Sequence, residues 1–348
     1  MNQVSNRTRH RFLEPRAQIY DLYWRFAADR QQIFFRRLEG EKYPWMADPI
    51  LNAHKFTNAY RASDRVSQYL IRNVIYGAGY SSKPREVAFR ILLFKLFNKE
   101  STWELLERNL GPLSWEGFSA DSYDRVLTAA TAMGTRIYSA AYIIPPVALG
   151  NSKIKHRGHL QLIELMLSGD FVSRMQDSRD LRELFSLIKS FPSLGDFLAL
   201  QLAIDMNYSE IVDHDEGEFV VAGPGARDGL SKMFPGSSAE NASSLISVMS
   251  ERQEAEFSRL GIQFRSLWGR PLQLIDCQNL FCEVSKYTRI SHPQIAGLSG
   301  RTRIKQIFRQ TGPLPQPWYP PKWGINSMIP QYGVFDEASF SRRPNELF

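Results

Sequence analysis

The chain has 348 residues, of which 43% are hydrophobic and 23% charged, so it can bury a full core and is not a disordered tail. Its 43 Lys and Arg against 36 Asp and Glu leave a formal net charge of +7, which favours a polyanionic partner. The two cysteines, Cys277 and Cys282, allow neither a disulfide framework nor a zinc site of the usual spacing, which indicates a reducing compartment.

The sequence offers no membrane or export signal. Its most apolar stretches, residues 91–97 and 140–149, are too short to span a bilayer and are interrupted by a lysine and by two prolines. The polar, basic amino terminus has no apolar segment behind it that would serve as a secretory signal. We therefore expect a cytoplasmic protein that does not associate with a membrane.

Apolar residues recur at helical spacing along most of the chain, beginning with an amphipathic segment whose arginines form a basic face. The STWE sequence from Ser101 has the pattern of a capping box, and only residues 218–222 look strand-like. The sequence predicts an all-α fold, with helices at residues 18–38, 55–76, 84–98, from 101, 122–142, 159–175, 178–190, 195–206, 238–260 and 271–287.

We predict a single helical domain over residues 1–300, with two lobes and a basic cleft between them. The composition changes after Gly300, where a basic stretch precedes a segment rich in proline and tryptophan. We expect residues 301–348 to form an ordered extension packed on the domain, because a disordered end rarely holds so many aromatic side chains.

The segment 187–206 has the form of a helix-hairpin-helix: an amphipathic helix, a tight Phe-Pro-Ser-Leu-Gly turn and a second apolar helix. In such a unit the turn amides, here those of Ser193, Leu194 and Gly195, can hold a nucleic-acid phosphate at the positive end of the second helix. An ordinary corner between two helices gives the same pattern, and the turn alone favours that alternative.

The hairpin resembles that of the helix-hairpin-helix DNA glycosylase superfamily, in which a catalytic aspartate follows roughly twenty residues later, near the start of another helix. This spacing points to Asp215, with Glu218 and Asp228 as further candidate catalytic carboxylates. An alternative register places residues 223–226 (GPGA) at the family's aspartate and leaves Asp228 as the first acid of the next helix. Phe197 stands where bifunctional members carry a Schiff-base lysine, so the resemblance implies a monofunctional enzyme.

Longer stretches in the same order carry a wider resemblance: YWRFAADRQQIFFRRLEG, DPILNAHKFTNAYRASDRVSQYLI, ILLFKLFNKESTWELL, GPGARDGL and IDCQNLFCEVSKY. They are similar to a helical family of thymine-hypermodification proteins, the alpha-glutamyl/putrescinyl thymine pyrophosphorylase-like family, which is related to the helical domain of hydroxymethyluracil DNA kinase. The resemblance implies a glycosylase-like α fold that acts on a modified base in double-stranded DNA. The sequence lacks a P-loop signature, so we expect that it is not the kinase itself.

The segment KFTNAYRASDR lies where glycosylases of this superfamily carry the helix and loop that enter the DNA stack. The resemblance therefore implies that Asn58, Tyr60 and Arg61 fill the gap left by a flipped base or contact its edge. Asp64 and Arg65 would orient these side chains. The alternative is that Asp64 and Arg65 form a surface ion pair and that Tyr60 belongs to the core.

A polar stripe follows one face of the helix expected at the end of the domain, at spacings of three and four residues: Asp276, Asn279, Glu283 and Lys286. Such a stripe is usually solvated, but neighbouring apolar residues leave it room to line a cleft. In that alternative Glu283 and Lys286 contact the flipped base, a phosphate or an activated leaving group. The six histidines form no metal constellation, and we expect neither a metal nor another cofactor.

The sequence favours glycosidic cleavage as the first hypothesis. In it, a DNA N-glycosylase flips a hypermodified base, for example a hydroxymethyl- or glycosyl-hydroxymethyl-pyrimidine, out of DNA, excises it and leaves an abasic site. One carboxylate would stabilise the cation that develops on the sugar. Such an enzyme could defend a host against phages with modified DNA. The first alternative is an amino acid or polyamine:DNA transferase acting on pyrophosphorylated 5-hydroxymethyluracil, and the second is a non-catalytic reader of modified DNA.

Overall fold

The computed structural model describes residues 13–140, 144–147, 149, 153–310, 312 and 314–332. Within these residues the chain forms helices and no β-strand, which confirms the predicted all-α fold. The α-helices are α1 (Ala17–Leu38), α2 (Pro49–Ala53), α3 (Arg65–Tyr69), α4 (Pro84–Phe97), α5 (Glu100–Leu110), α6 (Ala120–Ala132), α7 (Lys155–Ser168), α8 (Phe171–Gln176), α9 (Leu181–Lys189), α10 (Asp196–Asn207), α11 (Pro224–Met233), α12 (Ala242–Arg259) and α13 (Leu274–Ser291). The described residues also form three short 3₁₀ turns and one π-helix. The turns are η1 (Arg61–Ser63), η3 (Pro321–Trp323) and η4 (Asn326–Met328), and the π-helix is η2 (Leu70–Ile75).

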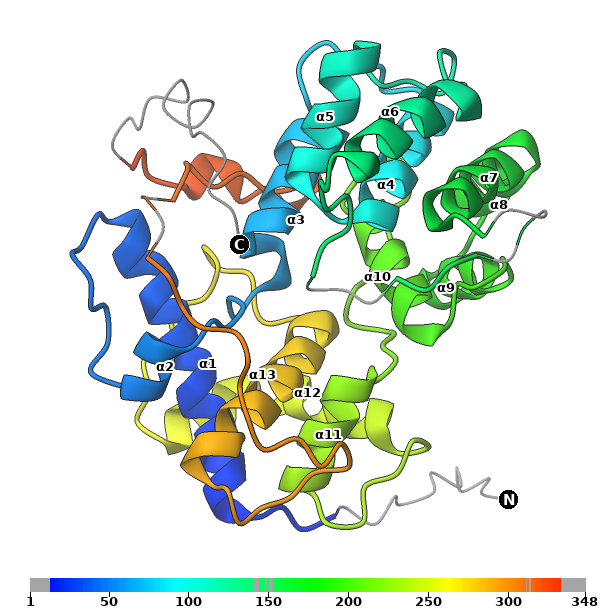
Figure 1. The fold of residues 1–348 in the computed structure, drawn as a ribbon. Coiled ribbons are helices and arrows are strands. Elements are labelled where there is room, and N and C mark those ends of the chain that lie inside the picture. Colours follow the sequence, from blue (N-terminus) through cyan, green and yellow to red (C-terminus); the bar gives the residue numbers. More distant parts are fainter. Residues whose placement is uncertain are drawn as a thin grey trace, which may run out of the picture.

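The helices form two groups (Figure 1). Helices α4 to α9 lie together in the upper part of the view, and α1, α2, α11, α12 and α13 lie in the lower part, with α10 between them. Helix α10 is buried on nearly every side because it packs on both α9 and α4. A functional division into two lobes with a basic cleft stays a prediction.

Helix α11 approaches α13 closely because glycines lie at the contact. A β-carbon on Gly229 would stand 2.2 Å from the carbonyl oxygen of Phe281, and one on Gly225 would stand 2.8 Å from Sγ of Cys282. The Phe281 oxygen is a backbone atom, so the approach requires glycine at position 229, whereas a β-carbon at position 225 would force the Cys282 side chain to shift. The packing places the amino end of α11 beside the middle of α13.

Several local predictions differ from the structure. The helix expected over residues 122–142 ends at Ala132 as α6, and the helix expected over residues 159–175 is divided into α7 and α8. Residues 54–60 form a loop, so the helix expected from residue 55 begins only at η1, and the strand-like residues 218–222 form no strand. The STWE capping box is also wrong: α5 begins at Glu100, and its N-cap residue Lys99 makes no side-chain capping bond. Helix α11 was not expected, because its GPGARDG sequence is poor in helix formers.

The described part of the carboxyl-terminal extension packs on the helices. Tyr319 is fully buried, and its hydroxyl lies 2.8 Å from that of Ser63, within hydrogen-bond distance. The amide of Trp318 donates a hydrogen bond to the side-chain oxygen of Gln68 at 3.0 Å. Residues 333–348 of the predicted extension lie outside the described residues. Across the part that is described, no helix is long and apolar enough to cross a bilayer.

Candidate functional site

The loop that follows α2 is shaped by groups from distant parts of the chain. Residues 306–308 pair with residues 53–55, at the end of α2 and the start of this loop, through two backbone hydrogen bonds of 3.0 Å. Arg30, buried on α1, donates hydrogen bonds to the carbonyl oxygens of Phe56 (3.2 Å) and Thr57 (2.9 Å). Because these backbone groups are engaged outside the segment, they are not available for helical hydrogen bonds.

Two carboxylates hold the amides of the same loop. Thr57 N–H donates to Oε2 of Glu283 on α13 at 3.1 Å, and Asn58 N–H donates to Oδ1 of Asp64 at 2.8 Å. Lys286, one helical turn after Glu283, forms an ion pair with it at 2.6 Å. Asn58, Asp64, Glu283 and Lys286, which the sequence analysis proposed from two separate segments, thus lie together. We call these four residues the Asp64 cluster.

Asp64 has an unusual protonation equilibrium. Burial raises the pKa of Asp64 to about 7, and the nearby charge of Glu283 adds to this, although the Asn58 amide and Arg30 favour the ionised form. Burial likewise lowers the pKa of Arg30 to about 10, so its guanidinium remains charged at neutral pH. A carboxyl group with a pKa near 7 can both accept and release a proton under physiological conditions.

Several cations lie near this carboxyl group, among them Arg30 and Lys55, which interact electrostatically with it. Nζ of Lys286 lies 4.6 Å from the centre of the Phe56 ring. Lys55 is exposed beside the cluster, and its pKa is lowered by partial burial and by the positive charges of Arg65 and Lys286. Arg65 is exposed and pairs with Glu100, so its ion pair is not with Asp64. The arrangement combines a proton acceptor with positive charges that can neutralise a phosphate group.

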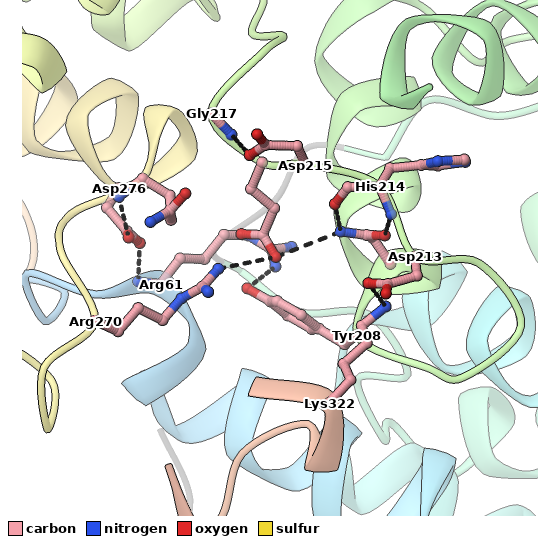
Figure 2. Close-up of polar contacts among 12 residues, drawn as sticks. Arg61, Tyr208, Asp213, His214, Asp215, Gly217, Arg270, Asp276 and Lys322 are labelled. Atoms are coloured by element: carbon pink, nitrogen blue, oxygen red, sulfur yellow. Dashed lines mark hydrogen bonds and ion pairs between the residues drawn. The ribbon is translucent and has the colours of Figure 1, made fainter. Parts of the chain in front are cut away.

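Tyr60 and Arg61, proposed from the sequence to contact a base, point into the protein. Tyr60 is 1% exposed, and its hydroxyl donates a hydrogen bond to the carbonyl oxygen of Arg270 at 2.7 Å. Arg61 is 3% exposed and occupies a buried polar network (Figure 2). Its guanidinium donates to Oδ1 of Asp205 at 2.6 Å and to the hydroxyl of Tyr208 at 2.9 Å, which ties η1 to α10.

The network continues to two further helices. The backbone amide of Arg61 donates to Oδ1 of Asp276 at the start of α13, at 2.7 Å, and burial raises the pKa of Asp276 to about 7. On α4, Nζ of Lys95 lies 2.8 Å from Oδ2 of Asp205, and burial lowers the pKa of Lys95 to about 8. This pair was not predicted, although Lys95 and Asp205 each lie within a mostly apolar stretch of the sequence.

Two of the candidate catalytic acids lie at the surface. Asp215 is exposed and accepts the amide of Gly217 at 2.7 Å (Figure 2), and Glu218 is exposed as well. Between them Glu216 is buried, and its Oε1 lies 3.4 Å from the guanidinium of Arg270. The buried acid of this segment is therefore one that the sequence analysis had not selected.

The third candidate, Asp228, is buried between α11 and α13. It is 3% exposed, its Oδ1 accepts the amide of Ser299 at 2.6 Å, and its Oδ2 accepts the hydroxyl of Ser285. Burial acts to raise its pKa, but these hydrogen bonds outweigh burial and bring the pKa of Asp228 below its usual value. An ionised Asp228 thus links α11 to α13 and to the turn that contains Ser299.

Two helices, α9 and α10, with a short turn between them cover the segment of the predicted hairpin. Ser193 in the turn has a left-handed backbone (φ 63°), Leu194 is buried, and Gly195 is the N-cap residue of α10. Lys189 at the end of α9 forms an ion pair of 2.6 Å with Asp196 in the first turn of α10. A carboxylate therefore already lies at the positive end of α10, and phosphate binding by this turn stays a prediction.

Comparison with known proteins places the chain among the helical domains of DNA-modifying enzymes. Residues 17–297 match the family described as "5-hmdU DNA kinase, helical domain", and the chain belongs to this family. A relative from Bacillus phage SP10, named 5-hmdU DNA kinase, is 24% identical over 292 residues, which cover 77% of this chain and 45% of the relative. The chain thus spans about half the length of that curated relative. No solved structure matches the chain significantly.

This membership corrects the preferred hypothesis from the sequence. A DNA kinase is a transferase, whereas an N-glycosylase is a hydrolase that leaves an abasic site, so the prediction of a DNA glycosylase is wrong. The wider family resemblance is confirmed, but the comparisons show no relation to the helix-hairpin-helix glycosylases. The error arose because the hairpin pattern, which many helical proteins share, was given a specific chemistry.

Proposed function

We propose that the chain is a transferase that acts on 5-hydroxymethyluracil in double-stranded DNA. In this proposal an amine of an amino acid or polyamine replaces the pyrophosphate on an activated 5-hydroxymethyl group. The observation that supports the reaction is the Asp64 cluster, in which a carboxyl group with a pKa of about 7 lies beside Glu283, Lys286 and Arg30. The names of the family and of its SP10 relative supply the substrate class.

The reaction forms a C–N bond and breaks a C–O bond at the exocyclic methylene carbon of the base. The amine nitrogen provides the electron pair for the new bond, and pyrophosphate departs with the electrons of the old one. Ionised Asp64 accepts the proton that the attacking amine loses. Lys286 and Lys55 offset the negative charge of the departing pyrophosphate, whose neutralisation lowers the barrier.

Contact with the DNA backbone uses the same region. Lys55 and Arg65 are exposed beside the Asp64 cluster, where they can approach phosphates of the strand that carries the modified base. The formal charge of +7 adds a general attraction for DNA that weakens with salt.

The name of the SP10 relative favours a second candidate, phosphoryl transfer to the 5-hydroxymethyl group. Here Asp64 would accept the proton of the hydroxymethyl oxygen while a nucleoside triphosphate supplies the phosphoryl group. The sequence contains no P-loop signature to hold such a donor, which is why we place this reaction second.

Mass spectrometry of digested DNA distinguishes the two reactions. Duplexes with one 5-hydroxymethyluracil, or with its pyrophosphorylated form, are incubated with glutamate, with putrescine or with ATP. The proposal expects an amine-bearing nucleoside only from the pyrophosphorylated duplex with an amine, and a loss of about 100-fold or more in the Asp64→Asn variant. The matched control is Asp170→Asn, which changes an exposed aspartate of the other helix group.

Each of the other outcomes has a definite meaning. A phosphate-bearing nucleoside formed with ATP from the hydroxymethyl duplex establishes the second candidate in place of the first. Failure of every combination to alter the modified nucleoside contradicts both. An Asp64→Asn variant as active as the wild type removes the proposed role of the Asp64 cluster.

A further inference from the structure

A buried amide on α13 faces the amino end of α11. Gln278 has no exposed surface, and its Oε1 lacks a hydrogen-bond partner. The same oxygen lies 3.7 Å from the place that a β-carbon would take on Gly223, the N-cap residue of α11. A buried carbonyl oxygen without a donor costs free energy, so the site calls for a ligand that supplies an N–H group.

Neighbouring side chains fix the orientation of this amide. Nε2 of Gln278 donates to Oδ1 of Asn279 at 3.1 Å and also approaches Sγ of Cys282 at 3.7 Å. These contacts engage the nitrogen side of the group and leave Oε1 directed toward Gly223. Gln278 therefore presents an acceptor rather than a donor.

The end of α11 presents donors beside that acceptor. The first amides of a helix have no partner within the helix, and they carry its partial positive charge. Gly223, the N-cap residue, has no side chain that could cap these amides. Pro224 has no amide proton, so the first amide donors of α11 are those of Gly225 and Ala226. The amino end of α11 thus places N–H donors near the carbonyl acceptor of Gln278.

We propose that Gln278 is a specificity-determining residue that recognises the uracil ring of the target base, an inference that rests on the proposed transferase function. Its Oε1 accepts the N3–H of a 5-substituted uracil, while the first amides of α11 donate to a neighbouring ring carbonyl. A uracil imide presents this donor beside an acceptor. Cytosine has an unprotonated N3, which would leave Oε1 unpaired, and an amino group that would meet the helix amides.

The Phe197 ring lies against Gly223 at the amino end of α11. Its Cδ2 lies 2.9 Å from the position of the missing β-carbon on Gly223, and its ring is only partly buried. There is no room for a base while the ring stays in this place, so binding displaces it. The displaced ring then stacks on the flipped base, as aromatic side chains do in enzymes that extrude a nucleotide.

The recognition site and the Asp64 cluster both include residues of α13. Cys282, which contacts both the Gln278 amide and the space at Gly225, precedes Glu283 of the Asp64 cluster in α13. A base held by its imide edge at Gln278 would direct its other edge, with the 5-substituent, away from α11. Gln278 and Glu283, whose carboxylate holds the loop of the Asp64 cluster, thus belong to the same helix, α13.

Fluorescence anisotropy with three duplexes tests the inference, using 5-hydroxymethyluracil, 5-hydroxymethylcytosine or an unmodified base at one position and a single salt concentration. We expect the wild type to bind the hydroxymethyluracil duplex about tenfold or more tightly than the hydroxymethylcytosine duplex. Gln278→Met, which keeps the side-chain volume and removes the acceptor, should reduce this preference to about one. Gln31→Met is the matched control, because Gln31 is another buried glutamine with an unpartnered amide and lies on α1.

A second probe needs no variant and so does not depend on folding. A methyl group on N3 of 5-hydroxymethyluracil removes the proposed donor and weakens base pairing, which would otherwise favour flipping. The inference expects the wild type to bind this duplex about tenfold more weakly than its N3–H counterpart. Equal or tighter binding overturns it.

The outcomes separate the inference from the proposed function. If the wild type prefers both hydroxymethylated duplexes over the unmodified one but does not distinguish them, or if Gln278→Met keeps the preference for uracil, only the role of Gln278 is overturned. If the wild type binds all three duplexes equally, recognition of modified DNA fails, and the inference fails with it.

Discussion

Asp64 and Glu283 accept hydrogen bonds from two consecutive backbone amides, those of Asn58 at 2.8 Å and Thr57 at 3.1 Å. Two carboxylates that are distant in the sequence are thereby held close together. Their repulsion adds to the effect of burial and helps to raise the pKa of Asp64 to about 7. The pair is therefore unequal, because one partner binds a proton near neutral pH, and this inequality underlies the following two predictions.

The transfer reaction should require ionised Asp64. Because the pKa of Asp64 is about 7, we expect the rate to rise through pH 7 and to level off about one unit above it. In Asp64→Asn this rise should disappear together with most of the rate. Initial rates between pH 5.5 and 9 provide the measurement. An unchanged rise in the variant would assign the titration to another group.

Folding stability should show the opposite trend. The folded protein binds the Asp64 proton more strongly than the unfolded chain, in which this carboxyl has its ordinary pKa of 3.8. Stability is therefore lost as pH rises from about 4 to about 7. Asp64→Asn cannot lose this proton, so its stability relative to the wild type should increase over that interval. Urea denaturation at pH 5 and pH 8 measures the difference, and a constant difference would contradict it.

Arg61 should matter for stability far more than Arg65. Replacing buried Arg61 with methionine removes the partner of Oδ1 of Asp205 and of the Tyr208 hydroxyl, at a cost of about 3–5 kcal/mol. Arg65→Met breaks an exposed pair with Glu100 and should cost about 1 kcal/mol or less. Thermal unfolding of both variants provides the comparison. Equal, small losses would mean that the network contributes little.

The contact between α11 and α13 should not tolerate a methyl group. In Gly229→Ala the new β-carbon would stand 2.2 Å from the carbonyl oxygen of Phe281, a backbone atom that cannot rotate away. We expect a loss of about 3 kcal/mol in the free energy of unfolding. Gly169→Ala is the control, because its nearest contact would be 3.9 Å and its change should stay within about 1 kcal/mol. Similar values for the two would show that α11 can move outward.

The sequence was sufficient where local patterns decide the structure. The apolar spacing near residues 18–38 and the apolar run near residues 84–98 predicted α1 and α4 within two residues at each end. The sequence was insufficient where residues far apart in the chain determine the local structure. Residues 55–60 of the loop were predicted as helix, because nothing local shows that Arg30 binds carbonyl groups of this loop and that Glu283 binds one of its amides.

The residues of the candidate site were likewise predicted only in part. Asn58, Asp64, Glu283 and Lys286 were selected from two segments, and the structure brings them together. Their segments also held Arg61, whose burial a sequence cannot reveal, because a short polar stretch looks alike in the core and at the surface. Gln278 was not selected at all. Its significance depends on an unpaired oxygen, which only coordinates show.

The pairing of residues 306–308 with residues 53–55 has a consequence for protein synthesis. The loop that carries Asn58 is made early, yet the segment that fastens it leaves the ribosome when most of the domain has already emerged. Until then helices α1 to α13 can assemble around an unfastened loop. Contacts so distant in the sequence form slowly. A nascent chain would therefore gain its helical body first, and the start of this loop would be paired last.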